Sequence, residues 1–129
     1  MKKIALFVLG VALLCVCDAG AHHSFAMFDD SKTISLEGTV KSWEWKNPHA
    51  WLTVEAVDPK THKVAEWGLE GYAIGTLRNM GYARDSLKAG EKVTVTVNPR
   101  KDGVVGGFFL NVKFADGRVL GGSTRQSER

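Results

Sequence analysis

Apolar and polar residues alternate along five stretches of the chain, which is typical of strands with one buried and one exposed face. Turn residues such as Asn47-Pro48 and Asp58-Pro59 bound these stretches, because proline excludes the residue before it from helical conformations. We therefore predict strands over residues 33–40, 51–56, 65–70, 93–97 and 108–114, followed by a brief strand at 119–120.

The alternation slips by one residue at Trp43 and Trp45. Two explanations remain open: a β-bulge at Lys41-Ser42, or a strand bent sharply enough to show both faces. In the last long strand the alternation continues without a slip, so four apolar residues are expected on one face: Phe108, Leu110, Val112 and Phe114.

A different spacing separates the third predicted strand from the fourth. Ile74, Leu77 and Met80 recur every three residues, and Gly81 follows as a C-terminal cap, which predicts a short helix. Three strands, one helix and two strands is the order of the OB-fold. The predicted fold class is therefore mainly β: a small OB-fold-like, five-stranded Greek-key barrel. One short helix between strands 3 and 4 would cover an end of this barrel, where its apolar side is buried.

The amino-terminal residues have the composition of a secretory signal peptide. Lys2 and Lys3 precede the apolar run 4–16, and the small residues Ala19-Gly20-Ala21 fit a cleavage site. The run is shorter than the roughly 20 apolar residues that a membrane-spanning helix needs, so we predict no stable membrane span. We assign residues 1–21 to the signal peptide, 22–120 to the OB-fold-like β domain and 121–129 to a flexible tail.

Removal of the signal peptide changes the charge balance and the cysteine content. The chain of 129 residues carries 17 basic and 14 acidic residues; losing two lysines and one aspartate leaves 15 and 13, a net charge of +2. This excess is too small for the dense phosphate contacts that drive nucleic-acid binding. Both cysteines leave as well, which excludes cysteine catalysis, cysteine ligation of a metal and disulfides from the mature domain. The expected partner is a periplasmic protein or a small ligand.

Cleavage after Ala21 would make His22 the first residue of the mature chain, which gives this histidine a particular chemistry. A terminal histidine offers its α-amino nitrogen and a ring nitrogen to one metal ion, and a second imidazole completes a three-nitrogen set suited to copper(II). His49, in a turn stiffened by Pro48, is the expected third ligand, and His23 is an alternative through its own ring. The opposing interpretation is that these histidines are exposed and bind nothing specific.

The aromatic residues support a second interpretation. Three tryptophans flank the turn that holds His49: Trp43, Trp45 and Trp51. Exposed rings on an OB-fold stack on sugars or bases. Trp51 has the opposite parity to the apolar residues of its strand, so we expect it to cover the arm 22–28 and to dock the amino terminus beside His49. Trp67 keeps the inward parity and is assigned to the core.

The sequence lacks the motifs of several enzyme classes. Its glutamates alternate along strands without paired-carboxylate spacing, its serines lack a nucleophile elbow, and its glycine-rich 103–107 segment lacks the ending of a phosphate-binding loop. The sequence therefore favours a binding or accessory module over an enzyme. Two forms remain open: an exported module that holds copper, or an OB-type module that binds an oligosaccharide, a peptide or a protein without a metal.

Four segments resemble a family of small exported bacterial proteins of unknown function. They are the His22-His23-Ser24-Phe25 start, the Glu37-Gly38-Thr39-Val40 strand, the stretch from Trp45 to Trp51 with its Asn47-Pro48-His49-Ala50-Trp51 motif, and the stretch from Arg84 to Gly90. The resemblance covers about residues 22–120. It implies an OB-like β fold and a periplasmic or secreted protein of a Gram-negative bacterium. It implies no activity, substrate or cofactor, so the copper hypothesis depends on ligand chemistry alone.

Overall fold

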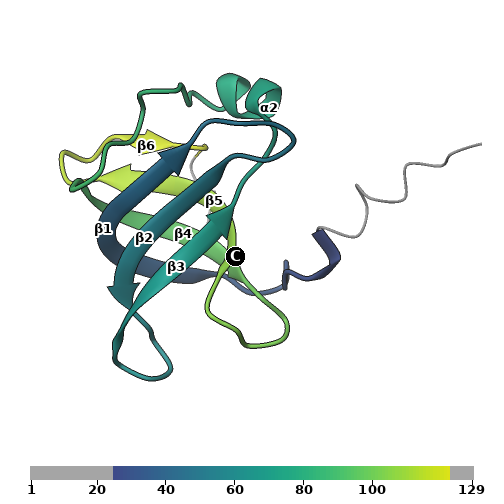
Figure 1. Ribbon diagram of the computed structural model, residues 1–129, viewed down its shortest axis with the longest axis vertical. Helices are drawn as coiled ribbons and strands as arrows, with labels where there is room; N and C mark the ends of the chain where they lie inside the picture. Colours follow the sequence, from purple (N-terminus) through teal and green to yellow (C-terminus); the bar gives the residue numbers. More distant parts are fainter. Residues whose placement is uncertain (1–24, 123–129) are drawn as a thin grey trace, which may run out of the picture.

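The computed structural model describes residues 25–122, in which strands curve into a barrel with a short helix at one end (Figure 1). Apolar residues that alternate with polar ones form these strands, as Val93, Val95 and Val97 do between polar neighbours. In chain order the elements are β1 (Ile34–Glu44), β2 (Trp51–Val57), β3 (Val64–Glu70), α2 (Ile74–Asn79), β4 (Lys92–Pro99), β5 (Gly107–Phe114) and β6 (Val119–Leu120).

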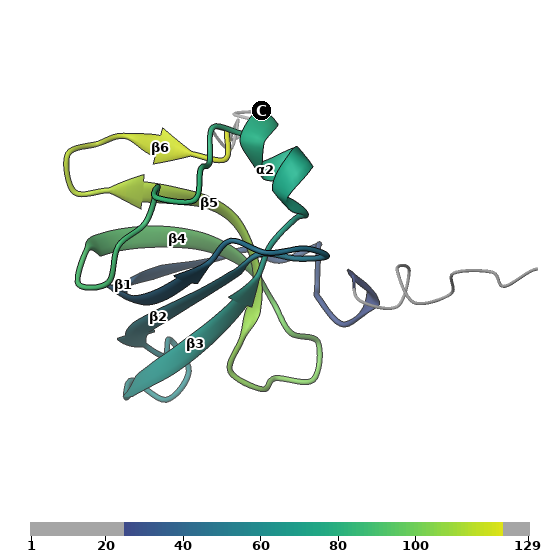
Figure 2. The ribbon, with the colours of Figure 1, turned by 45° about the horizontal axis from the view of Figure 1, so that its top comes forward.

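Closure of the barrel joins strands that are distant in sequence. The sheet has the order β3-β2-β1-β4-β5-β6, and β3 also pairs in parallel with β5. This parallel seam is short, with register pairs of Leu69 with Gly107 and Glu70 with Phe108. Figure 2 shows the strands curving toward the seam, with β6 set against β5. Within residues 25–122 the structure confirms the predicted fold, a mainly β, OB-fold-like five-stranded barrel with a helix between β3 and β4.

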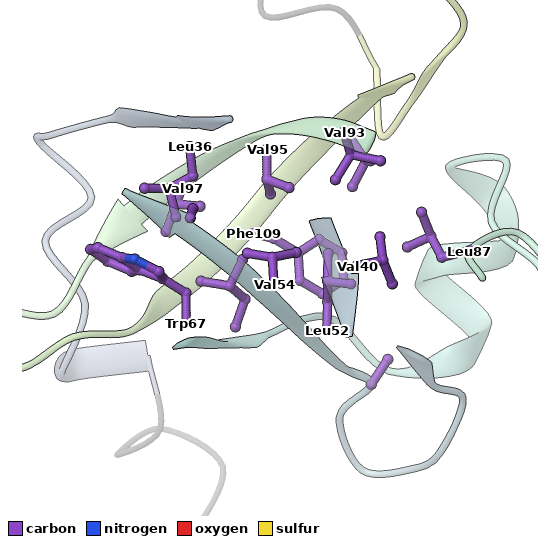
Figure 3. Packing of buried hydrophobic residues seen from close by; sticks show 14 of the residues in the cluster. Leu36, Val40, Leu52, Val54, Trp67, Leu87, Val93, Val95, Val97 and Phe109 are labelled. Carbon is purple, nitrogen blue, oxygen red and sulfur yellow. The ribbon is translucent and has the colours of Figure 1, made fainter. Parts of the chain in front are cut away.

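The barrel interior is filled by the residues that the alternation places inward (Figure 3). Fully buried members come from five different strands: Leu36, Val40, Leu52, Val54, Leu69, Val95, Val97, Phe109 and Val112. Trp67 of β3 is 5% exposed and belongs to the same cluster, as the sequence predicts. Because strands from both sides of the seam contribute, burial of the core adds to the few seam pairs in keeping the barrel closed.

A β-bulge in β1 explains the slip in the alternation. The register of β1 against β2 shifts between Val40 and Ser42, so that Trp43 lies opposite Leu52 and faces inward. Of the two explanations left open by the sequence, the bulge is correct. It bends β1 so that the same strand pairs with β2 and with β4.

A second register shift, between Thr96 and Val97 of β4, changes the parity of β5. The expectation that Phe108 and Leu110 share the inward face with the later residues of this strand is therefore wrong. Phe109, directly opposite Val97, is 1% exposed and packs in the core. Phe108 is also buried, but its ring packs against the segment that precedes β1.

The helix α2 covers one end of the barrel. Leu77 is fully buried in the core and Met80 packs at its edge. The helix ends before Gly81, whose φ of +91° suits glycine, and the N–H of Tyr82 donates to the carbonyl of Leu77. Gly121, assigned to the tail from sequence, donates its N–H to the carbonyl of Met80 and so is tied to this end.

The predicted signal peptide lies outside the described residues, as does the predicted tail apart from Gly121 and Gly122. In residues 25–122, every helix is too short or too polar to cross a membrane.

Candidate functional site

The candidate site is built around the turn at residues 47–50, which we call the His49 turn. Main-chain hydrogen bonds join it to the end of β3: the N–H of Ala50 donates to the carbonyl of Tyr72, and the N–H of Gly71 donates to the carbonyl of Ala50. Oδ1 of Asn47 accepts a hydrogen bond from the N–H of Ile74 at 3.1 Å, at the start of α2. Both sides of the turn are therefore fixed to the barrel.

The hydrogen bond of His49 determines which ring nitrogen is available. Nδ1 lies 3.0 Å from the carbonyl oxygen of Gly71. Because a carbonyl oxygen only accepts, Nδ1 carries the proton in the neutral ring and Nε2 keeps its lone pair. A backbone carbonyl that receives the other ring N–H is the usual outer-shell partner of a metal-ligating histidine. The hydrogen bond holds the ring of His49 in place, and the side chain, 24% exposed, remains accessible to solvent.

A carboxylate adds negative charge beside this ring. Oε1 of Glu70 lies 3.5 Å from Nδ1 of His49, and the side chain of Glu70 is 11% exposed. Glu70 is placed there by the register of the sheet, since it lies directly opposite Trp51 at the start of β2. The carboxylate favours a positive charge at this end of β3.

The amino-terminal segment packs on the same site. The ring of Phe25 lies 5.9 Å from that of His49, edge to face, and 5.3 Å from that of Phe108. Tyr72 completes the cluster, with its ring 4.8 Å from Phe108 and 6.3 Å from Phe25. Figures 1 and 2 both show this segment on the side where β3 and β5 meet.

Backbone hydrogen bonds hold this segment, residues 25–29, which we call the N-terminal strap. Phe28 forms a β-bridge with Arg100, the N–H of Asp29 donates to the carbonyl of Pro99, and the N–H of Lys101 donates to the carbonyl of Met27. The ring of Phe28 is 6% exposed and lies 5.7 Å from Phe108. The strap is therefore a structural part of the barrel.

Only one of the three predicted metal ligands, His49, lies in the described residues. His22 and His23 lie outside the described residues. Of the predicted set, the structure places His49, and it brings Phe25, three residues after His22, against the ring of His49. Within residues 25–122, histidine, aspartate and glutamate form no group of three or more that could hold a metal ion.

The three tryptophans proposed as a ligand face do not share one surface. Trp43 faces inward, its indole N–H donates to the carbonyl of Ala83, and its ring lies 5.7 Å from Trp45. Trp51 lies on the outer side of the barrel against Gly68, where a Cβ would meet the indole Cζ2 at 3.2 Å. Trp43 and Trp45 both pack against the core, so of the three tryptophans Trp51 is the one on the outer face of β2 and β3.

Sequence reasoning missed Glu70, Gly71 and Tyr72 as neighbours of His49. The sequence expectation that Trp51 docks the terminus also differs from the observed contacts: in the described part of the chain, the rings that contact Phe25 are those of His49, Tyr72 and Phe108. An available signal was the abrupt end of β3 at Gly71, where the chain must turn close to the strand that precedes it.

The fold and the site define a class: a small OB-fold-like barrel with an oriented imidazole at one rim and an aromatic amino-terminal strap beside it. A family model described as a family of unknown function (DUF6152) matches residues 11–109, and the chain belongs to this family. The curated proteins and the solved structures yield no match to the chain.

Proposed function

We propose that the protein is an exported copper-holding module whose metal site forms between the amino end of the mature chain and His49. The observation that carries the proposal is the packing of Phe25 against the ring of His49. In this proposal the protein is periplasmic or secreted, which depends on the signal-peptide pattern of residues 1–21. The role is to hold or deliver the ion, with a periplasmic protein as the natural recipient.

The position of Phe25 limits where the amino end can go. Three residues of fully extended chain span at most about 10 Å, at roughly 3.3–3.6 Å per residue. With Phe25 against His49, the α-amino group of a chain that begins at His22 stays within short reach of the His49 ring. This tethering raises the effective concentration of the terminal ligands at the imidazole.

The ligand chemistry fits copper(II). The α-amino nitrogen and Nδ1 of His22 would close a chelate ring, and Nε2 of His49 would supply a third nitrogen; His23 is the alternative imidazole. Nitrogen ligands in a tetragonal arrangement are what copper(II) prefers. The hydrogen bond from Nδ1 of His49 to Gly71 supports the proposal because it orients Nε2 as the donor.

Copper(II) titration of matched chains tests the proposal. One chain begins at His22, a second carries one additional residue before His22, and a third begins at His22 with His49→Ala. We expect affinity to fall more than about 100-fold in the second and third chains, beyond the usual cost of losing an outer-shell partner. Affinity should also fall in acid, because the ligand nitrogens must lose protons. Equal, weak binding by all three chains would reject the copper site.

A second candidate function is favoured by the position of Trp51. OB-folds bind oligosaccharides and oligonucleotides on the face of strands 2 and 3, and Trp51 lies on that face against Gly68. In this alternative the protein binds an oligosaccharide, a peptide or another protein, and the histidines are incidental. A glycan panel that quenches tryptophan fluorescence in the wild-type protein, but not in Trp51→Ala, would favour it.

A further inference from the structure

A separate cavity of about 190 Å³ lies at the end of the barrel opposite α2. It is enclosed by the β2–β3 hairpin at residues 58–60 and by the β4–β5 loop at residues 100–106. Figures 1 and 2 show these two loops together, away from the helix. The cavity is large enough for a small organic molecule, since one water needs only about 10–15 Å³ of the same measure.

The charges that line the cavity leave an excess of cations. Lys32 is paired with Asp29 at 3.3 Å, and the carboxylate of Asp58 accepts a hydrogen bond from the N–H of Lys60. Within residues 25–122 the ammonium groups of Lys60 and Lys101, which also line the cavity, have no ion pair.

The side chain of Lys60 reaches from the β2–β3 hairpin to the β4–β5 loop. Its ammonium lies 3.7 Å from the point where a Cβ on Gly103 would stand, so the hairpin and the β4–β5 loop meet at this side chain. A cation that bridges two loops without a carboxylate partner is placed to receive an anion from solvent.

One residue that lines the same cavity, Trp67, carries a buried donor without an acceptor in residues 25–122. Trp67 lines it and is 5% exposed, and its indole Nε1 has no hydrogen-bond partner in the part of the chain that the structure describes. Buried N–H groups in native proteins nearly always have a partner, from the protein, from water or from a ligand. We therefore expect an acceptor oxygen from outside the described residues to bind this N–H.

The rest of the lining is apolar. Ile34, Pro59, Pro99, Val104 and Val105 surround the opening, and Val104 and Val105 are exposed without a covering element. We propose that this cavity binds a small carboxylate with a short apolar tail. Lys60 and Lys101 neutralise its charge, the indole N–H of Trp67 donates to one oxygen, and the tail lies against the valines. Because Nε1 is shielded from solvent, binding includes a shift of the loop between Gly103 and Gly106, both at positive φ.

Proton–nitrogen NMR tests this site with hexanoate as the probe. The four tryptophans give four indole signals, and Trp67→Phe identifies the signal of Trp67. We expect hexanoate to shift this signal in a saturable manner at millimolar concentration. Hexylammonium, which has the same tail and the opposite charge, should leave the signal in place.

Lysine variants on the exposed loops provide the matched controls. Lys60→Gln should weaken hexanoate binding about threefold or more. Lys88→Gln, at an exposed lysine outside the cavity lining, should bind like the wild type. The proposal is overturned if the Trp67 signal stays fixed, if hexylammonium shifts it equally, or if Lys60→Gln retains full affinity. These outcomes are independent of copper, since the cavity uses neither His22 nor His49.

Discussion

At the α2 end of the barrel the side-chain donors of Trp43 and Tyr82 have acceptors, whereas at the opposite end the buried indole N–H of Trp67 has none among the described residues. The indole N–H of Trp43 donates to Ala83, and the hydroxyl of Tyr82 donates to the carbonyl of Leu120. Burial raises the pKa of the Tyr82 phenol, which keeps it a donor. The indole N–H of Trp67, at the other end, lies beside a cavity without an acceptor among the described residues.

The difference follows from what covers each end. A helix and a loop cover the first end, where Leu77 is buried in the core and the carbonyls of Ala83 and Leu120 accept hydrogen bonds. At the second end two loops meet without a covering helix, and a cavity lies between them. We therefore expect the α2 end, the sealed end, to contribute more to the free energy of unfolding, and the cavity end, the open end, to bind a ligand. Four predictions test or sharpen this contrast.

The largest effect is expected from truncating the side chain that seals the α2 end. Leu77 is fully buried, so Leu77→Ala should lower the free energy of unfolding by about 2–5 kcal/mol. Ile34 lines the cavity at the open end and is only partly buried, so Ile34→Ala should cost roughly half as much or less. Urea unfolding measures both. Equal losses would contradict the contrast between the two ends.

A smaller effect is expected where the His49 turn meets α2. Asn47→Ala removes the acceptor of the Ile74 N–H and should cost about 1 kcal/mol, as for loss of a helix cap. Asn47→Asp keeps an acceptor oxygen and should retain most of the stability. Thermal unfolding compares the two variants, and an equal loss in both would mean that this hydrogen bond is not what fixes the turn.

The ring of Phe25 should matter more for binding than for stability. Phe25 is 45% exposed, so Phe25→Ala should change unfolding by no more than about 1 kcal/mol. If the strap tethers the amino end at His49, the same variant should lower copper(II) affinity roughly tenfold in the chain that begins at His22. Met27→Ala, at a similarly exposed strap residue, is the control. A similar loss of affinity in both variants would argue against a specific role for the ring of Phe25.

The smallest effect is a pH dependence at the open end. Hydrogen bonding to Arg100 lowers the pKa of Asp102 from its ordinary 3.8 to about 2. A carboxylate with a lowered folded-state pKa contributes stability that is present above about pH 4 and is lost as the pH falls toward 2. Asp102→Asn should therefore remove a small part of the acid sensitivity in that window. The free energy of unfolding, measured as a function of pH for the wild type and the variant, tests this prediction. Identical pH dependence of the two proteins would show that the exposed Arg100–Asp102 pair does not contribute to stability.

Much of the fold could be predicted because each strand carries its own pattern. Leu36, Val54 and Val95 show their burial through alternation with polar neighbours. The slip at Trp43 indicated either a bulge or a sharp bend in β1, and the structure has the bulge. The parity of β5 could not be predicted in this way. Phe108 and Phe109 are equally apolar. The choice between them depends on the extra residue in β5, Leu110, at the register shift against β4, and on the strap that packs on Phe108.

The candidate site was predictable only in part. The stiff turn indicated His49, but its neighbours Glu70 and Gly71 come from the pairing of β2 with β3 and from the main chain beyond it. A carbonyl that orients an imidazole leaves no trace in the sequence, since every residue has a carbonyl. The buried indole of Trp67 was correctly assigned to the core, yet its missing acceptor depends on how two distant loops meet.

The parallel seam between β3 and β5 has a mechanical consequence. In the described residues its register pairs are only Leu69–Gly107 and Glu70–Phe108. Phe25 touches both sides of it, through Tyr72 after β3 and Phe108 on β5, and so acts as a clasp across the joint. Removal of the amino-terminal residues up to and including Phe25 should therefore weaken the pairing of β3 with β5. We expect the backbone amides of this pairing to be the first whose hydrogen exchange becomes faster.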